Sequence, residues 1–220
     1  MQTSRIPNNR IRKLRTLGLG PNNYYLERIN KKGLTENLID LCSNDYLGLS
    51  RDNDVIEAAY ESSLKEGLGS GSSLFISGSR PVHSLLEKEI AKWLNREKVL
   101  LFPSGFQANI AAVQALADRK TIVIADKFIH NSLIHGVKAS GARFIRFNHN
   151  NLEDLEKRLT KVAPEKKSIL VIIESLYSME GSLAPLDKII PICKKHKAKL
   201  LVDEAHAFGI VGEEGKGLSY

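Results

Sequence analysis

The stretch Ile169-Leu170-Val171-Ile172-Ile173, residues 169–173, decides the fold of this 220-residue chain. Five consecutive apolar residues, four of them β-branched, are typical of a strand that is buried on both faces of a sheet. Four further short apolar runs of this kind are spread along the chain, at Val99–Phe102, Thr121–Ala125, Phe144–Phe147 and Leu200–Val202.

Helical patterns lie between these apolar runs. A regular alternation of strand and helix favours a mostly parallel sheet with helices on both faces. The sequence therefore predicts an α/β fold. The helical patterns cover Gln107–Ala117, Leu133–Ser140, Leu152–Leu159 and Leu186–His196.

The part of the chain before Val99 has a different organisation. Asn37–Cys42 predicts a short strand and Val55–Glu66 a helix. A Gly/Ser stretch at Gly67–Ser73 follows, but it is too short to be a domain linker. A helix is then expected over Pro81–Asn95, since a proline in the first turn of a helix loses no hydrogen bond.

The formal net charge of +7 lies entirely in the first 32 residues. That leader holds eight basic residues and one acid, so residues 33–220 contain 24 basic and 24 acidic residues. A basic arm could contact nucleic acid or an anionic ligand, or resemble a mitochondrial leader. We favour a solvated helix packed by Ile11, Leu14 and Leu17, and we expect no nucleic-acid partner.

Other classes of protein are disfavoured by composition. No apolar run approaches the roughly 18–20 residues of a membrane-spanning helix, and no stretch resembles a secretory signal. The two cysteines, Cys42 and Cys193, fit neither a disulfide framework nor metal-ligand spacing. We therefore expect no membrane or metal site, and free thiols in a reducing compartment.

Polar residues follow the apolar runs, where ligands bind in open α/β sheets. Ser104-Gly105 leads from an expected strand into a helix, whose free N–H groups would suit a phosphate. A Ser-Gly helix cap is also common without any function. The segments to inspect are Pro103–Phe106, Asp126–His130, Glu174–Gly181 and Asp203–His206.

Asp203 is the most informative of these residues. A carboxylate at the end of a strand suits pyridoxal phosphate, whose ring nitrogen needs an anion beside it to stay protonated. His206 could then donate to the ring hydroxyl, and His130 could lie flat against the ring. An aspartate at the end of a strand, considered alone, is more often a metal ligand or a helix cap than a partner of this cofactor.

Asp203-Glu204-Ala205-His206 also spells a helicase box, which offers a function of another class. Such a box requires a phosphate-binding loop of the type Gly-x4-Gly-Lys-Ser/Thr. Around Gly215-Lys216, the first glycine is replaced by Ile210 and the hydroxyl residue by Gly217. This loop also follows the box instead of preceding it, so the helicase hypothesis fails.

Taken together, eight motifs between Asp40 and Gly217 resemble the α-oxoamine synthase family of fold-type I pyridoxal-phosphate enzymes. Each motif alone is modest, but their common order and spacing are highly specific. The motifs are Ser43–Leu49, Gly69–Ser72, Ile76–Glu87 in part, Ser104–Asn109, Ala125-Asp126 with His130, Glu174–Gly181, Asp203–His206 and Gly209–Gly212.

The resemblance implies a role for each matching residue. Gly105 and Phe106 would offer backbone N–H groups to the cofactor, and His130 would stack on its ring and help position the substrate. Asp203 would pair with the ring nitrogen, so that His130 and Asp203 are the candidate catalytic residues. The remaining expected contacts are Ser178 and His206 to the cofactor, and Asn44 and, by a loose match, Arg15 to the substrate.

The resemblance also implies a reaction. We expect the decarboxylative condensation of L-alanine with a pimeloyl thioester, carried by CoA or an acyl-carrier protein, in biotin synthesis. Glycine-using relatives, 5-aminolevulinate synthase and glycine C-acetyltransferase, share nearly all the motifs and remain an alternative. The family implies a cytoplasmic homodimer.

Two family features lie outside the sequence, which ends at Tyr220. These are the Schiff-base lysine and the small C-terminal domain. We expect residues 1–50 to form an arm with a short strand, and residues 51–220 an incomplete, C-terminally truncated cofactor-binding large domain. The chain would then be an inactive fragment or, alternatively, a non-catalytic remnant that acts as a binding module or partner subunit.

Overall fold

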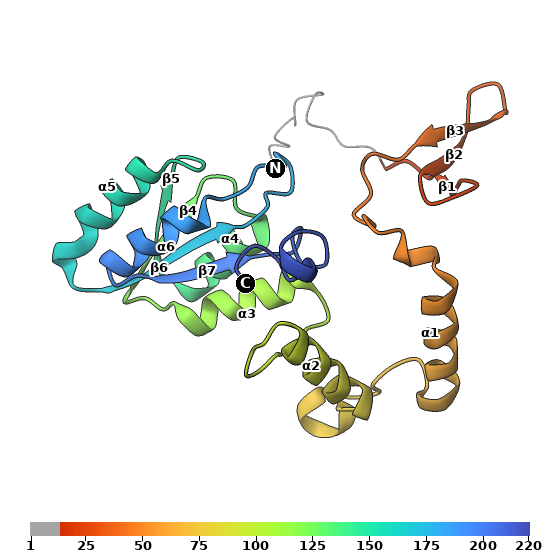
Figure 1. The fold of residues 1–220 in the computed structure, drawn as a ribbon, viewed down its shortest axis with the longest axis horizontal. Helices are drawn as coiled ribbons and strands as arrows, with labels where there is room; N and C mark the ends of the chain where they lie inside the picture. Colours follow the sequence, from red (N-terminus) through yellow and green to blue (C-terminus); the bar gives the residue numbers. More distant parts are fainter. Residues whose placement is uncertain (1–13) are drawn as a thin grey trace, which may run out of the picture. The chain divides into compact units, whose positions relative to one another are not determined.

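The computed structural model describes residues 14–220 and divides the chain into two compact units, Met1–Gly69 and Ser70–Tyr220 (Figure 1). Each unit is described by itself. The domain boundary expected at residue 50 stays a prediction.

The first unit contains a small antiparallel sheet in the order β1-β2-β3, followed by helices. In the β2–β3 hairpin, Tyr25 pairs with Ile39 and Ile29 with Thr35. Its turn is closed by the Asn30 side chain, which accepts from Lys32 N at 2.9 Å, and by Gly33 with a φ of 77°. The elements are β1 (Gly18–Leu19), β2 (Tyr25–Ile29), β3 (Thr35–Ile39), η2 (Leu49–Arg51) and α1 (Asn53–Glu66).

Two expectations for this unit need correction. The strand expected at 37–42 is β3, which begins and ends earlier, and its partners β1 and β2 were not expected. The basic helix is not formed where the structure describes the leader, because Leu14 and Leu17 precede β1 in irregular backbone. Ile11 lies outside the described residues.

The second unit is built on a four-stranded sheet in the order β5-β4-β6-β7, in which all neighbours are parallel. This confirms the expected parallel α/β architecture. The four predicted helices, and the four predicted strands from Thr121 onward, agree with the structure to within a few residues. The strands are β4 (Thr121–Asp126), β5 (Arg143–Phe147), β6 (Ser168–Glu174) and β7 (Lys199–Asp203).

Helices cover both faces of this sheet (Figure 1). One face packs against α3 (Gly105–Leu116) and α4 (Asn131–Ser140), and the other against α5 (Leu152–Val162) and α6 (Leu186–Lys195). α3 and α4 lie close together at Gly136, where an added Cβ would come within 2.9 Å of Val113 Cβ. Short 3-10 turns, η4 (Ala163–Glu165) and η5 (Glu213–Gly215), complete this part of the unit.

Side-chain alternation along the strands separates two polar groups at the carboxyl edge of the sheet. Ile124 and Ile173 face α5 and α6, whereas Ile172 and Leu201 face α3 and α4. By the same alternation, Asp126 belongs to the α5–α6 face. Glu174 and Asp203 end their strands on the α3–α4 face.

The strand expected at Val99–Phe102 is wrong, because this run is irregular. Leu101 N donates to the Glu87 carboxylate at 3.2 Å instead of a neighbouring strand, and Leu100 is 76% exposed. An apolar run becomes a strand only where another strand supplies hydrogen-bond partners. Before it lie a π-helical turn, η3 (Leu74–Gly78), and α2 (Pro81–Trp93), the helix expected at Pro81.

The described residues contain no helix long and apolar enough to cross a membrane. Cys42 is exposed and Cys193 is buried, and both are free. Burial raises the pKa of the Cys193 thiol to about 11, so this thiol is inert at neutral pH.

Replacing Leu159, a fully buried residue of α5, by alanine should lower the free energy of unfolding by about 2–5 kcal/mol through loss of apolar contacts and a residual cavity. Leu100→Ala, at an exposed position, is the matched control and should change it by less than about 0.5 kcal/mol. Urea denaturation followed by circular dichroism measures both. Equal losses in the two variants would contradict the described core.

Candidate functional site

The carboxyl edge of the parallel sheet brings together polar residues from the α3–α4 face. Glu174 and Asp203 are direct partners in the β6–β7 register. The N-terminus of α4 lies at this edge because the helix follows the end of β4, and the first turns of α3 reach the edge through the contact of Asn109 with Asp203. This is the edge at which parallel α/β sheets bind ligands.

A chain of hydrogen bonds connects Asp203 with His130. Asn109 Nδ2 on α3 donates to Asp203 Oδ2 at 2.7 Å and to Ser132 Oγ at 2.9 Å. Ser132 is fully buried, and its Oγ lies 2.6 Å from His130 Nδ1. His130 caps α4, since Nδ1 also accepts from Ser132 N at 3.2 Å. Asp203 and His130, expected to act on one ligand, therefore belong to one polar network.

The start of α3 is open towards solvent. Ser104 caps this helix by accepting from Gln107 N at 3.2 Å, and Gly105 is its first residue. A Cβ added at Gly105 would meet no atom within 4 Å. Phe106 is exposed, and its ring centroid lies 5.8 Å from that of His135. The first amides of α3 are thus available to an anion.

Ser178 and His206 lie in the loops that follow β6 and β7. Ser178 is exposed, and its backbone N donates to Glu174 Oε2 at 3.4 Å. His206 is half-buried in the turn after Asp203, whose Oδ1 accepts from Ala205 N at 2.9 Å. Both residues follow strand ends on the edge that carries Asp203, but their contacts with a cofactor stay predictions.

The two expected substrate residues belong to the first unit. Asn44 is exposed and its Oδ1 lies 3.5 Å from the Tyr46 hydroxyl, which can donate to it. Arg15 is exposed ahead of β1. Their roles towards a substrate stay predictions.

Glu174 is a buried carboxyl group with an unusual environment. Its side chain is 2% exposed, and Oε1 has no hydrogen-bond partner among the described residues. Burial and the neighbouring Asp203 raise the pKa of Glu174 to about 7, against the opposing effect of the Ser178 and His130 N–H groups. At a pH near 7, Glu174 is therefore about half protonated, whereas an ordinary glutamate would be fully ionised.

These residues fit pyridoxal phosphate. The site offers a carboxylate, Asp203, whose position is fixed by Asn109 and which can face a protonated ring nitrogen. It offers free amides at the start of α3 for a phosphate, with open space at Gly105. It also contains an unpaired buried oxygen, Glu174 Oε1, that a polar ligand would satisfy. In residues 14–220, no cluster of three or more His, Cys, Asp or Glu could hold a metal ion.

Sequence reasoning gave no role to Asn109, Ser132 or Glu174. Asn109 could have been found from its spacing, because it lies four residues after Gly105 and hence on the same face of α3. Ser132, two residues after His130, has a spacing typical of a side-chain cap. The pairing of Glu174 with Asp203 depends on strand register, which the sequence alone does not give.

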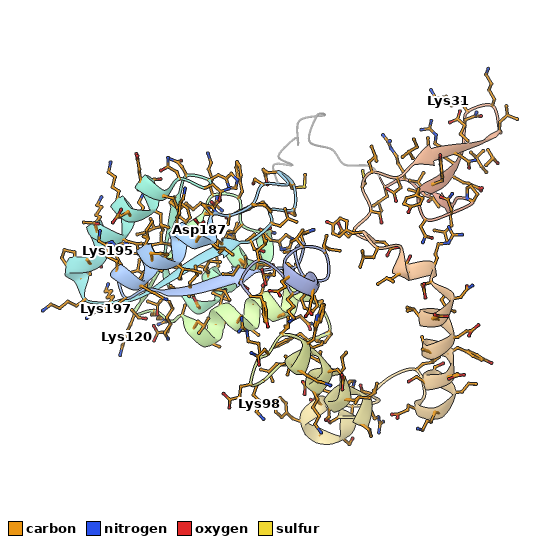
Figure 2. All side chains as sticks on the ribbon, viewed as in Figure 1. Lys31, Lys98, Lys120, Asp187, Lys195 and Lys197 are labelled. Carbon is orange, nitrogen blue, oxygen red and sulfur yellow. The ribbon has the colours of Figure 1, made fainter. Side chains whose placement is uncertain are left out.

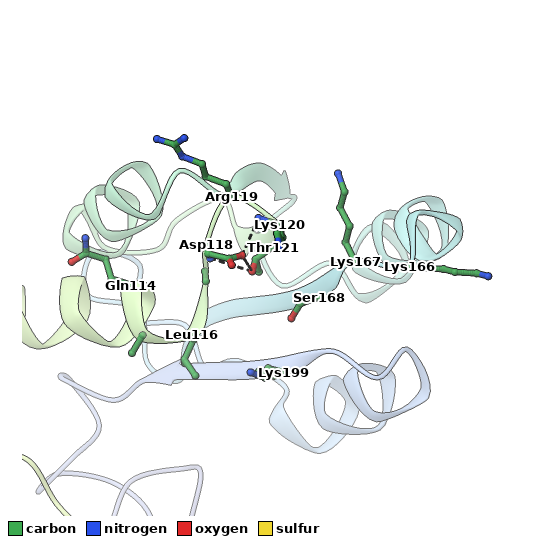
Figure 3. Close-up of a pocket in the computed structure, with 12 residues that line it drawn as sticks. Gln114, Leu116, Asp118, Arg119, Lys120, Thr121, Lys166, Lys167, Ser168 and Lys199 are labelled. Carbon is green, nitrogen blue, oxygen red and sulfur yellow. Dashed lines mark hydrogen bonds between the residues drawn. The ribbon is translucent and has the colours of Figure 1, made fainter.

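A hollow of about 760 Å³ lies elsewhere, at the amino ends of β4, β6 and β7 (Figure 3). Among the residues that line it, Thr121 Oγ1 donates to Asp118 Oδ1 at 2.9 Å. Its rim is basic, with Arg119, Lys166 and Lys199 among its residues. Because Asp203 ends β7 and Lys199 begins it, this hollow lies at the opposite edge of the sheet from the candidate site.

The raised pKa of Glu174 predicts a pH-dependent stability. The folded chain binds this proton more tightly than the unfolded chain, so the contribution is complete below pH 4.5 and is lost as the pH rises to about 7. Glu174→Gln imitates the protonated form. It should match the parent chain at pH 4.5 and exceed its free energy of unfolding by roughly 3 kcal/mol at pH 8.

Urea denaturation at a series of pH values measures this difference. Glu97→Gln, at an exposed carboxyl, is the control and should leave the pH profile unchanged. Parallel profiles for the parent and Glu174→Gln would show that Glu174 ionises normally.

Comparisons with known proteins agree with the geometry. The profile of the family described as aminotransferase class I and II matches residues 36–217. The 8-amino-7-oxononanoate synthase of Saccharophagus degradans is 40% identical over 98% of this chain and 53% of its own length. That of Herminiimonas arsenicoxydans is 42% identical over 82% of this chain and 46% of its own. The chain therefore spans about half the length of the curated relatives it matches.

Solved structures agree as well. Serine palmitoyltransferase of Sphingomonas wittichii superimposes with a TM-score of 0.82 at 34% identity, over 90% of this chain and 48% of that one. A serine palmitoyltransferase of S. paucimobilis with bound pyridoxal phosphate gives 0.84 at 32% identity, over 92% and 50%. The 8-amino-7-oxononanoate synthase of Francisella tularensis gives 0.68 at 34% identity, over 82% and 49%.

These relatives confirm the resemblance to α-oxoamine synthases, and pyridoxal phosphate as the cofactor of that group. Because the family profile covers most of the chain, and the sheet carries the expected strand-end residues, this chain belongs to the aminotransferase class I and II family.

Proposed function

We propose that this chain supplies the cofactor-binding part of a pyridoxal-phosphate-dependent C-acyltransferase. The reaction joins L-alanine to a pimeloyl thioester, with loss of carbon dioxide and release of the thiol, to give 8-amino-7-oxononanoate. The observation that carries the proposal is the Asp203 carboxylate, which Asn109 holds at 2.7 Å on the same face of the sheet as the start of α3. Curated relatives with this activity in their name are 40–42% identical.

The proposed chemistry requires a carbanion at the amino acid's α-carbon. Bound pyridoxal phosphate supplies an electron sink that stabilises this carbanion. Asp203 would hold the proton on the ring nitrogen, and Asn109 would keep the carboxylate in place. The amides of Gly105 and Phe106 would bind the phosphate with the dipole of α3.

His130 and Ser178 would complete the surroundings of the ring. Because Nδ1 of His130 is engaged with Ser132, the orientation of its ring is fixed by the cap of α4. A fixed imidazole can stack on the flat ring of the cofactor and hold it in a single position. Ser178 and His206 would donate to the oxygen substituent of the ring.

The choice of amino acid is the finer part of the proposal. Sequence identity favours the alanine-using synthases of biotin synthesis. A serine-using reaction is the second candidate, because the serine palmitoyltransferases superimpose with higher TM-scores than the 8-amino-7-oxononanoate synthase of F. tularensis. Glycine-using relatives remain a further alternative within the same chemistry.

Substrate contacts and assembly complete the proposal. Asn44 and Arg15 would contact the substrates, and the acyl donor would be a thioester of CoA or of an acyl-carrier protein. We further propose a cytoplasmic homodimer in which residues 51–220 belong to the large domain.

Replacing Asp203 by asparagine should weaken pyridoxal phosphate binding roughly 10- to 100-fold, because the charge that stabilises a protonated ring nitrogen is lost. Asp187→Asn, at an exposed carboxylate on α6, is the matched control and should bind like the parent chain (Figure 2). Absorbance titration with pyridoxal phosphate measures both affinities. No binding by the parent chain, or equal binding by Asp203→Asn, would refute the proposed cofactor site.

The substrate is tested separately. The chain is incubated with pyridoxal phosphate, pimeloyl-CoA and either L-alanine, glycine or L-serine, and the products are identified by mass spectrometry. Exclusive formation of 8-amino-7-oxononanoate supports the alanine-using reaction, whereas a product from serine favours the second candidate. Bound cofactor without any product is the result expected both of an inactive fragment and of a non-catalytic binding module.

A further inference from the structure

A second polar network occupies the opposite face of the sheet's carboxyl edge. Asp126 ends β4 and is fully buried. His149 follows β5, and its Nδ1 lies 3.0 Å from Asp126 Oδ1. Its Nε2 lies 2.8 Å from Oγ of Ser182, which follows β6. The imidazole of His149 thus connects the carboxyl ends of β4, β5 and β6.

The environment of Asp126 fixes the tautomer of His149. Asp126 Oδ1 also accepts from Phe128 N, and Oδ2 accepts from Asn150 N, each at 2.9 Å. Because both Asp126 oxygens already accept from backbone N–H groups, we assign the hydrogen of the bond to Oδ1 to His149 Nδ1. The Nε2 lone pair of a neutral His149 then accepts from the Ser182 hydroxyl.

Further contacts attach the loop after β6 to the loop after β5. The His149 ring meets the buried Tyr177 edge-on, with 4.4 Å between ring centroids. Asn150 Nδ2 donates to Leu183 O at 3.0 Å. Within the β6 loop, Tyr177 N donates to Ser182 O at 3.0 Å. Both ends of the segment between Tyr177 and Ser182 are therefore held by the β5 loop.

Ser178 lies inside this segment. It follows Tyr177 directly, and Gly181 N closes the turn by donating to Tyr177 O at 2.9 Å. The base of this loop is joined to β7 and closed on itself, because Ser175 N donates to Asp203 O and Ala184 N donates to Ser175 O, each at 2.9 Å. Ser178 itself makes only a 3.4 Å bond, from its backbone N to Glu174 Oε2. That long bond is weak, so the position of Ser178 depends on the anchors at His149.

We propose that His149 is a positioning residue, which acts through Ser182 and Tyr177 to place Ser178 towards the cofactor. This inference rests on the proposed function. His149 touches neither the expected cofactor residues nor Asp203 in the structure, so its effect is indirect. In this proposal, Asp126 orients the imidazole of His149 and takes no part in the reaction.

Three variants separate the contacts of His149. His149→Ala removes all of them. His149→Asn can retain a donor to Asp126, because its amide nitrogen replaces Nδ1, but it is too short to reach Ser182. His149→Gln can extend an amide to the position of Nε2 and should restore the contact with Ser182 in part.

The first readout is amide hydrogen exchange of residues 175–184 in the full chain without cofactor. His149→Ala and His149→Asn should increase exchange of the Tyr177, Gly181 and Ala184 amides about tenfold, and His149→Gln by less. His196→Ala is the control for loss of a half-buried histidine elsewhere, at the end of α6, and should leave this loop unchanged. Unchanged exchange in all three His149 variants would overturn the inference.

The second readout is the affinity and absorbance spectrum of bound pyridoxal phosphate. We expect about tenfold weaker binding and a shifted spectrum for His149→Asn, partial recovery for His149→Gln, and parental values for His196→Ala. Parental affinity and spectrum in His149→Asn would overturn the positioning role, even if the loop exchanges faster. Failure of the parent chain to bind refutes the proposed function, whereas the exchange measurement still decides whether His149 holds the loop.

A third outcome concerns catalysis by the network itself, since Asp, His and Ser also form hydrolase triads. Ser182→Ala should behave like His149→Asn in both measurements. Covalent labelling of Ser182 in the parent chain by a fluorophosphonate would mean that Ser182 is a nucleophile, and would overturn the positioning role.

Discussion

A strand buried on both faces of a sheet has no water to satisfy its backbone, so every N–H and C=O must find a partner in the neighbouring strand. β4 and β6 obey this constraint, since nearly all their residues are buried between two helical layers. The ladder fixes the register of the strands and therefore where each one ends. The three strand-end carboxylates, Asp126, Glu174 and Asp203, owe their common edge to this register.

The alternation of side chains then divides those carboxylates between two environments. Asp126 accepts from Phe128 N and Asn150 N and contacts His149 Nδ1, and so forms the centre of a structural network. Glu174 and Asp203 share the other face, where one negative charge opposes another. One edge of the sheet thus provides both a rigid network around Asp126 and a pair of carboxyl groups in which Glu174 is protonated more readily than usual. The sheet itself separates the Asp126 network on one face from the Glu174–Asp203 pair on the other.

The sequence allowed the sheet to be predicted because runs such as Ile169–Ile173 can be buried only as central strands. The strand predicted at Val99–Phe102 was wrong, because this run is apolar but has no neighbouring strand to pair with. The hairpin of β2 and β3 was overlooked because its stabilising elements, Asn30 and Gly33, lie in a short turn whose effect depends on cross-strand pairing.

For the candidate site, the sequence predicted the polar residues after the strand ends, such as Asp203 and His130. It did not predict the residues that hold them in place, such as Asn109 and Ser132. Asp203 and Asn109 are 94 positions apart in sequence, so their contact follows from the packing of α3 on β7 rather than from any local pattern. His149 and Ser182 are 33 positions apart and meet for the same kind of reason.

Gly136 links helix packing to this chemistry. Its missing side chain lets α4 approach α3 beside Ile110 and Val113, one helical turn from Ser132 and next to Asn109. The hydrogen bond between Asn109 and Ser132 tolerates a displacement of only a few tenths of an ångström, which is less than the width of a methyl group. Evolution of this site is therefore restricted at a position that no ligand would touch, because the smallest possible addition there would separate the helices that carry its polar network.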